Sequence, residues 1–162
     1  MHPITALQTE YSLWERHVEA EILPTVRELG IGFVPYRPLG RGFLTGAITK
    51  GELGVKDFRT WGFPRTAGDA FDNNQVLVER VRAIAARRDV KAGQLALAWV
   101  LAKGDDIVPI PGTKRRTYLE ENAAAAEIEL TPSEVAELEA AVPIDEVMGD
   151  RYAGAFLHSI DR

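Results

Sequence analysis

The sequence contains no cysteine, and this absence excludes two classes of protein. A chain without thiols can form neither a disulfide framework nor a thiolate metal site. The three histidines, His2, His17 and His158, are scattered and lack the spacing of a zinc motif such as HExxH. We therefore expect no metal site, and a composition suited to the reducing cytoplasm.

An excess of positive charge and a long apolar run are also missing. The chain has 19 Lys and Arg against 24 Asp and Glu, a formal net charge of -5, whereas nucleic acids and membrane surfaces require a broad basic face. No stretch approaches the roughly 18 continuous apolar residues of a membrane span. Met1-His2-Pro3 lacks the regions of a signal peptide. We expect neither nucleic-acid nor membrane partners.

The chain does have enough apolar residues, 46% of 162, for a single domain over residues 1–162 with a real core. Short β-branched or apolar runs predict strands, and apolar residues three and four apart predict helices. Parallel pairing, and hence an α/β fold, follows from the alternation of these elements. A closed barrel of eight such units needs about 250 residues, so this chain can form only part of one. We expect strands at Ile4–Tyr11, at Gly32–Tyr36 and from Ile107. We expect helices at Trp14–Leu29, Leu77–Ala85, Gln94–Ala102, from Thr117 onward and at Pro132–Val142. A capping box of Thr131 and Glu134 marks the start of the last helix.

Two segments show no sustained period. Residues 47–74 hold four glycines and four aromatic residues, which predicts a long loop that folds back on something apolar, such as a lid or binding loop. Residues 143–162 carry glycine and isolated aromatic residues and are expected to form a tail across the surface.

The stretch from Ile107 to Asn122 carries the clearest chemical signal. A buried strand is followed by Pro111-Gly112, then Thr113, three consecutive cations at 114–116, and the start of a helix. Free N–H groups and the helix dipole favour an anion at such a place, and arginine adds forked donors that match phosphate oxygens. The residues predict a phosphate site; the alternative is a solvated basic turn.

Five segments stand in order along nearly the whole chain: ALQTEYSLW (Ala6 to Trp14), ELGIGFVPYRPLGRGFLTG (Glu28 to Gly46), DFR (Asp57 to Arg59), IVPIPGTKRRTYLEENAAA (Ile107 to Ala125) and GDRY (Gly149 to Tyr152). Together they resemble the aldo-keto reductases. This family consists of (β/α)8 barrels that reduce aldehydes and ketones with NADPH. The resemblance implies that the chain is the C-terminal portion of such a barrel, with strands six to eight, their helices and the C-terminal extension.

The resemblance also implies the residues that bind NADP(H). Gln8 would contact the nicotinamide amide, and Tyr36 would stack on the nicotinamide ring. The loop of Arg37, Leu39, Gly40, Arg41 and Gly42 would embrace the pyrophosphate, with Arg37 where many relatives have serine. Gly112, Thr113, Lys114 and Arg115 would hold the adenosine 2'-phosphate, and Glu121 and Asn122 would lie near the adenine. In some relatives an arginine stands four residues before that asparagine, where this chain has Tyr118.

The family draws its catalytic Asp, Tyr, Lys and His from the first four strands, and no stretch here matches them. We therefore expect no catalytic residue in this chain, and a truncation just before the sixth strand. In the complete enzyme, a small carbonyl compound would be the substrate. Three hypotheses stay open: the cofactor-binding half of a reductase that needs a complementing N-terminal half, an inactive half-barrel that binds a dinucleotide or a protein, and a non-functional fragment. Three parallel strands leave two unpaired edges, which predicts self-association.

Overall fold

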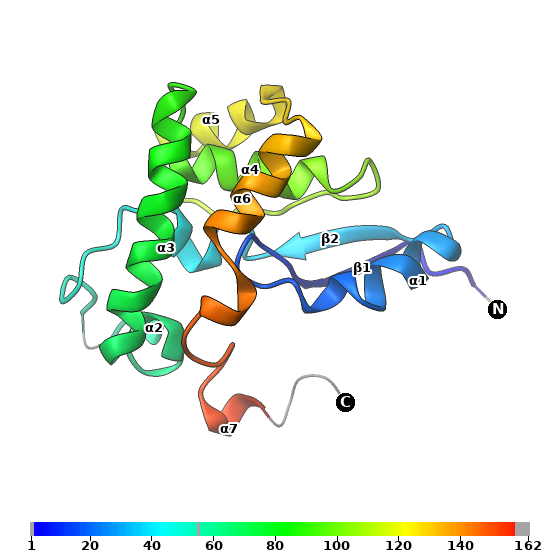
Figure 1. The fold of residues 1–162 in the computed structure, drawn as a ribbon. Helices are drawn as coiled ribbons and strands as arrows, with labels where there is room; N and C mark the ends of the chain where they lie inside the picture. The colour runs from blue at the N-terminus through cyan, green and yellow to red at the C-terminus, as the bar shows by residue number, and fades with distance from the viewer. Residues whose placement is uncertain (1, 55, 158–162) are drawn as a thin grey trace.

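Two parallel strands form the centre of the structure, a computed structural model that describes residues 2–54 and 56–157 (Figure 1). They pair in register from Ala6 opposite Gly32 to Glu10 opposite Tyr36. Helices α4, α5 and α6 lie on one side of the strands, and α7 lies on the opposite side (Figure 1). The elements are β1 (Ala6–Glu10), α1 (Ile22–Glu28), β2 (Gly32–Tyr36), α2 (Phe58–Trp61), α3 (Gly68–Arg87), α4 (Ala92–Ala102), α5 (Arg116–Ala124), α6 (Pro132–Ala141) and α7 (Gly154–Leu157), with short 3₁₀ turns between them.

The expected third strand is present only as two parallel bridges, Phe33 with Ile107 and Tyr36 with Ile110. Backbone hydrogen bonds from Val108 N to Phe33 O (2.9 Å) and from Ile110 N to Pro35 O (3.1 Å) hold the segment beside β2. Ile107 is buried, but Val108 and Ile110 are 62% and 46% exposed. The prediction of a buried strand is therefore correct only at its first residue, since Pro109 and Pro111 cannot donate to a ladder.

The first helix is shorter than its apolar spacing predicted. Trp14 and Val18 are buried, yet the helix begins only at Ile22. Before it, Ser12 and Glu15 exchange backbone hydrogen bonds of 3.0 and 3.1 Å, which close a tight turn. Trp14 is turned into the core, where it stacks on Phe43 at 5.1 Å. The apolar spacing of Trp14 and Val18 therefore indicates burial and not a helix. Pro24 lies in the first turn of α1, as expected.

The loop expected over residues 47–74 is wrong at its C-terminal end, because α3 already begins at Gly68. The polar residue Asn74 interrupts the apolar period by which the first turns of this helix could have been predicted. It is a polar residue on the buried face, with 0% exposure, and its amide donates to the carbonyls of Arg65 (2.9 Å) and Met148 (2.8 Å). The same amide oxygen accepts from the backbone N–H of Met148. Asn74 thus ties the C-terminal segment to α3; residues 158–162 of the expected tail, with His158, lie outside the described residues.

The three remaining helical predictions are confirmed, and the helix expected from Thr117 is α5, which begins at Arg116. Helix α4 is apolar on nearly all sides and is buried, including Trp99 at 0% exposure. At the start of α6, the Thr131 side chain accepts from the backbone of Glu134, and the Glu134 carboxylate accepts from the backbone of Thr131. Within residues 2–54 and 56–157 no helix has the length and apolar character needed to cross a bilayer, and no group of three or more metal-ligating side chains is found.

Candidate functional site

A cleft of about 860 Å³ opens where β2 and the segment after Ile107 end. Ligands of α/β proteins bind at the carboxyl ends of parallel strands, which is where these two segments terminate. Three parts of the chain form the walls: the loop after β2, the turn that leads into α5 with α5 itself, and the start of α4 together with Arg59 of α2. The lining residues are Tyr36, Arg37, Pro38, Leu39, Arg41, Gly42, Thr45, Ala47, Ile48, Arg59, Lys91, Gly93, Gln94, Ile110, Pro111, Gly112, Thr113, Tyr118, Glu121 and Asn122.

The loop after β2 has an unusual backbone. Arg37 and Arg41 have positive φ angles of 54° and 58°, a conformation that is uncommon for side chains other than glycine. The loop is held by Thr45, whose hydroxyl donates to Gly42 O at 2.6 Å, and by Arg59, which donates to Arg41 O at 3.1 Å. The Arg59 guanidinium donates two hydrogen bonds to the Asp57 carboxylate, with N–O distances of 2.9 and 2.6 Å. This ion pair keeps the pKa of Asp57 low, at about 2.

Arg41 is a cation without an ionic partner in the described part of the chain. Its guanidinium carbon lies 3.8 Å from the ring centre of Phe63 and 4.7 Å from that of Tyr152. All three guanidinium nitrogens are buried, and none makes a well-aligned hydrogen bond to a described residue. Burial, and then the charge of Arg37, lower the pKa of Arg41. A buried guanidinium left in this state is costly, so this side of the cleft is suited to an anion.

At the other end of the loop, charged groups surround the hydroxyl end of Tyr36. Glu10, the β1 residue opposite Tyr36, is 0% exposed and receives a 2.9 Å hydrogen bond from Arg151 Nε. Arg151 also donates to the Tyr36 hydroxyl at 3.0 Å. Arg37 lies 3.5 Å from the Glu10 carboxylate and donates to the Tyr152 hydroxyl. Burial, followed by the hydrogen bond with Tyr152, raises the pKa of Tyr36, which therefore stays protonated.

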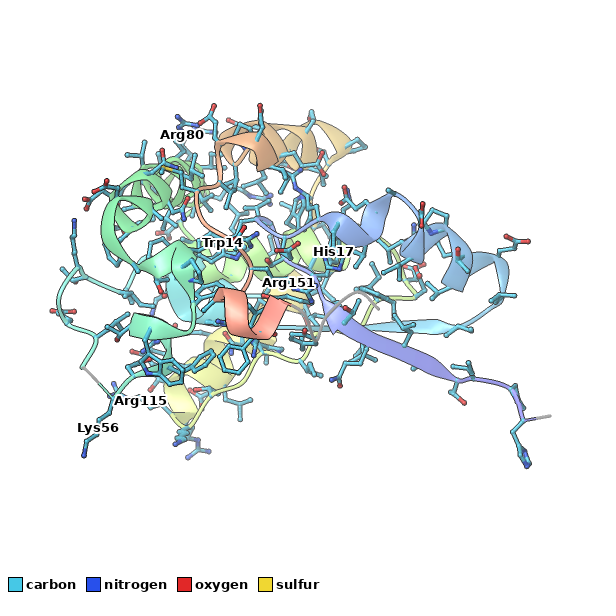
Figure 2. The ribbon with its side chains drawn as sticks, turned by 90° about the horizontal axis from the view of Figure 1, so that it is seen from below. Trp14, His17, Lys56, Arg80, Arg115 and Arg151 are labelled. Atoms are coloured by element: carbon cyan, nitrogen blue, oxygen red, sulfur yellow. The ribbon has the colours of Figure 1, made fainter. Side chains whose placement is uncertain are left out.

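The turn before α5 leaves the start of the helix without a side-chain cap. The N-cap residue Arg115 makes no side-chain capping bond, although the Thr113 hydroxyl accepts from its backbone N–H at 3.1 Å. Gly112 has open space where a side chain would stand. Arg115 lies at the periphery of the molecule (Figure 2), with its guanidinium carbon 5.6 Å from the ring centre of Tyr118, and Arg116 pairs with Glu120 at 3.2 Å. Lys114 and Arg115 are exposed.

The cleft brings together nine of the thirteen residues that the sequence predicted for the cofactor, and four lie elsewhere. Gln8 is exposed on β1 and does not line the cleft. Gly40 is buried beneath the loop, where a Cβ would stand 2.6 Å from Trp14. Lys114 and Arg115 are next to the cleft but outside its wall. The nine lining residues are Tyr36, Arg37, Leu39, Arg41, Gly42, Gly112, Thr113, Glu121 and Asn122.

Five polar residues of the cleft were not assigned a role from the sequence: Thr45, Arg59, Lys91, Gln94 and Tyr118. Arg59 could have been found from the charged group Asp57-Phe58-Arg59 in an otherwise irregular segment. Lys91 and Gln94 begin a helix that is otherwise apolar, and no local pattern marks them; Lys91 pairs with the Glu121 carboxylate, and Gln94 donates to Glu121 O at 3.2 Å. Tyr118, by contrast, was noted only as a departure from an arginine. It is 45% exposed and offers a ring to the cleft.

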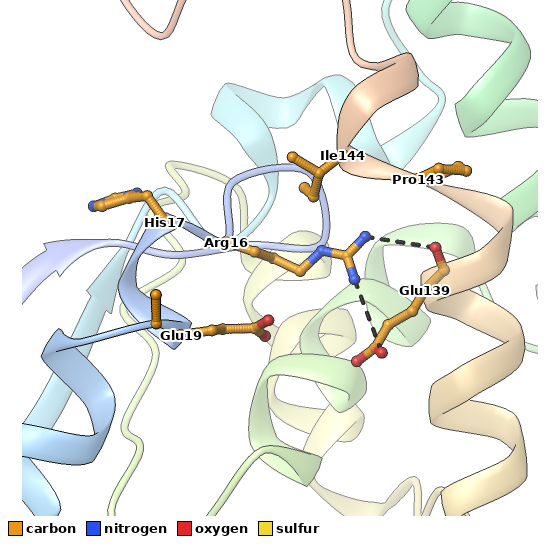
Figure 3. Close-up of a pocket in the computed structure, with 7 residues that line it drawn as sticks. Arg16, His17, Glu19, Glu139, Pro143 and Ile144 are labelled. Carbon is orange, nitrogen blue, oxygen red and sulfur yellow. Dashed lines mark hydrogen bonds and ion pairs between the residues drawn. The ribbon is translucent and has the colours of Figure 1, made fainter.

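A second, shallower hollow of about 660 Å³ lies between residues 16–20 and the end of α6 (Figure 3). Arg16 donates to the carbonyls of Val142 and Glu139 and lies 3.9 Å from the Glu139 carboxylate. Glu19 and Glu139 are both paired with Lys103, at 3.1 and 2.9 Å. Since these charges compensate one another, we assign no ligand to this hollow.

Comparison with known proteins identifies the family. The model of the aldo/keto reductase family matches residues 1–143. A probable aldo-keto reductase of Glycine max is 44% identical over 158 residues, which are 98% of this chain and 45% of the relative. The chain thus spans about half the length of that curated relative.

Solved structures show the same fold. A glycerol dehydrogenase from Gluconobacter oxydans, at 23% identity and a TM-score of 0.77, matches 88% of this chain and 44% of its own. An aldo-keto reductase from Klebsiella pneumoniae in complex with NADPH, at 23% identity and a TM-score of 0.61, matches 92% and 43%. The predicted fold, part of an α/β barrel, is confirmed. The chain belongs to the aldo/keto reductase family.

Proposed function

We propose that this chain is the NADP(H)-binding part of an aldo/keto reductase that reduces aldehydes or ketones to alcohols. The observation that carries the proposal is the cleft itself. Residues far apart in the sequence, from Tyr36 to Asn122, line one space at the carboxyl end of the strands, and nine of the lining residues are those that the family resemblance implied. Membership of the family supports the class of reaction, oxidation and reduction of a carbonyl or alcohol.

The residues of the cleft fit such a cofactor. Its volume, about 860 Å³, lies in the usual range for sites of small molecules and cofactors. The Arg41 guanidinium, whose three nitrogens make no well-aligned hydrogen bond to a described residue, offers donors to a diphosphate. Gly42, at a φ of 89°, and Gly112, with nothing near its Cβ position, let the backbone approach a ligand closely.

The two ends of the cleft support an orientation. The ring of Tyr36, fixed by hydrogen bonds at its hydroxyl, suits the nicotinamide, which would supply or accept the hydride. Lys114 and Arg115, beside the uncapped start of α5, suit the adenosine 2'-phosphate, a dianion near neutral pH. Glu121, which pairs with Lys91, and Asn122 line the cleft and would lie near the adenine. Gln8 would reach the nicotinamide amide only if the ligand extended past the wall of the cleft.

Catalysis by this chain alone is not part of the proposal. The resemblance assigns the acid–base residues to strands outside the matched segments, and the chain covers 45% of its Glycine max relative. We propose that carbonyl reduction requires further βα units, from another segment or another chain. On this proposal, the 162-residue chain binds the cofactor without oxidising it in the presence of an aldehyde.

Calorimetric titration of the chain with NADPH tests the proposal. We expect saturable binding with one site per chain, which Arg41→Met weakens, because Arg41 is the buried cation without an ionic partner. Arg87→Met, which removes an exposed cation on α3 that pairs with Glu137, is the control and should leave binding unchanged. Binding that does not saturate, or equal affinities for Arg41→Met and Arg87→Met, would contradict the proposed site.

A further inference from the structure

Arg37 sets a positive charge against the ring proposed to stack on the nicotinamide. Its guanidinium carbon lies 5.1 Å from the ring centre of Tyr36 and 5.1 Å from that of Tyr152, so that it is sandwiched between two tyrosines. The side chain therefore covers one face of the Tyr36 ring. While Arg37 keeps this position, a nicotinamide can stack only on the opposite face.

Arg37 shares its carboxylate partner with a second arginine. Glu10 supplies one negative charge, and its carboxylate is shared by Arg37 at 3.5 Å and Arg151 at 2.9 Å. Arg41 lies 4.7 Å from the ring centre of Tyr152 and adds a further positive charge near this ring. Since Arg151 holds the Glu10 carboxylate more closely than Arg37 does, the charge of Arg37 is only partly compensated, in surroundings that are partly shielded from water.

The two forms of the cofactor differ at the place where this charge acts. The nicotinamide ring carries a positive charge when oxidised and is neutral when reduced. The guanidinium of Arg37 makes a cation–π interaction with one face of the Tyr36 ring, and this weakens the attraction of the ring for a second cation, the oxidised nicotinamide. The phosphates are the same in both forms, so their attraction to the arginines does not distinguish NADP⁺ from NADPH.

We propose that Arg37 is a selectivity-determining residue, which makes the site favour reduced over oxidised nicotinamide. The inference rests on the proposed function and deepens it, because it concerns which form of the cofactor the chain retains. A site that favours NADPH is suited to reducing carbonyl compounds rather than to oxidising alcohols.

The test is the ratio of the dissociation constants for NADP⁺ and NADPH, measured by calorimetry at fixed ionic strength. Arg37→Met keeps the length of the side chain and removes its charge, and we expect it to lower this ratio about tenfold. Arg37→Lys keeps the charge and should retain most of the original ratio. Arg87→Met serves as the control for loss of a distant cation and should leave the ratio unchanged.

The outcomes separate the two proposals. If the unmodified chain binds neither form, the proposed function fails and this inference fails with it. If both forms bind but Arg37→Met shifts the two dissociation constants by the same factor, the proposed function stands and the selectivity role is wrong. If Arg37→Met fails to fold, Arg37→Lys still tests the inference. A fall of about tenfold in its ratio of the dissociation constants for NADP⁺ and NADPH would overturn the inference, because this variant keeps the charge.

Discussion

The Nε atom of Arg151 lies 2.9 Å from the Oε2 atom of Glu10, although the two residues are 141 positions apart. Arg151 is only 8% exposed and Glu10 is 0% exposed, so the contact joins the C-terminal segment to the end of β1 in the interior (Figure 2). The pair also brings Arg151 to the Tyr36 hydroxyl at the mouth of the cleft. The C-terminal segment is thus part of the site's framework.

Removal of Arg151 should therefore destabilise the fold. In Arg151→Met the Glu10 carboxylate stays buried, with Arg37 at 3.5 Å as its remaining cation. We expect the free energy of unfolding to fall by about 3 kcal/mol, because one partner of a buried ion pair is lost while the other stays. Urea unfolding measures this. Arg87→Met, which breaks an exposed pair, should cost less than about 1 kcal/mol, and equal losses in the two variants would show that the buried pair has no special role.

Gly40 and Gly30 form a matched pair for a test of the loop after β2. Both have positive φ angles, 56° and 65°. A Cβ at Gly40 would stand 2.6 Å from the Trp14 ring, whereas Gly30 has nothing within 4 Å. Gly30→Ala should cost about 1–2 kcal/mol from backbone strain, and Gly40→Ala about 1–3 kcal/mol more from overpacking. Thermal unfolding of the two variants checks this; a Gly40→Ala variant as stable as Gly30→Ala would mean that Trp14 yields without cost.

The Asp57–Arg59 ion pair predicts a pH dependence. The hydrogen bonds from Arg59 lower the pKa of Asp57 from 3.8 to about 2. A carboxyl group whose pKa is lower in the folded chain adds stability above its unfolded pKa and loses it as the pH falls toward the folded value. The unmodified chain should therefore exceed Asp57→Asn in stability at about pH 6, and this difference should shrink steadily between about pH 4 and about pH 2. Urea unfolding of both proteins across this range is the measurement, and a difference that does not change with pH would contradict it.

Lys114 and Arg115 should discriminate between NADPH and NADH. Both are exposed beside the uncapped start of α5, where a 2'-phosphate would find two cations. We expect the double change to alanine to weaken NADPH binding about tenfold and to leave NADH binding nearly unchanged. The double alanine variant of Arg80 and Arg87, two exposed cations on α3, is the matched control. Equal weakening of NADPH and NADH would show that these cations act on another part of the ligand.

The open edge of β1 predicts self-association. In the described residues β1 pairs only with β2, and the side chains of Ile4 and Val108 are 66% and 62% exposed. Unpaired strand edges with apolar side chains favour pairing between chains, and lysine at an edge opposes it. Sedimentation velocity should show species larger than a monomer, and Ile4→Lys with Val108→Lys should reduce them. Leu29→Lys, equally exposed at the end of α1, is the control; a monomer at all concentrations would contradict the prediction.

The order of strands and helices was accessible from the sequence because each element carries a local pattern. The five residues of β2 have the predicted bounds, and the capping box of α6 forms as its spacing requires. The pattern gave wrong helix starts at two places, where burial does not follow the helical period. Trp14 is buried by a turn rather than by a helix. Asn74 is a polar residue on the buried face of α3, and it donates hydrogen bonds to two carbonyls. Such partners are distant in sequence and leave no local signal.

The sequence by itself determined the family, the turn and cations at residues 111–116 and the loop at Arg37–Gly42, since these depend on residues that are neighbours along the chain. Only the tertiary structure showed that Arg41 lacks an ionic partner among the described residues, that Arg59, Lys91 and Gln94 line the same cleft, and that Arg151 reaches Glu10 and Tyr36. The physical reason is range. Local propensities act within a few residues, whereas the electrostatic environment of a side chain is set by whatever the fold places within several ångströms of it.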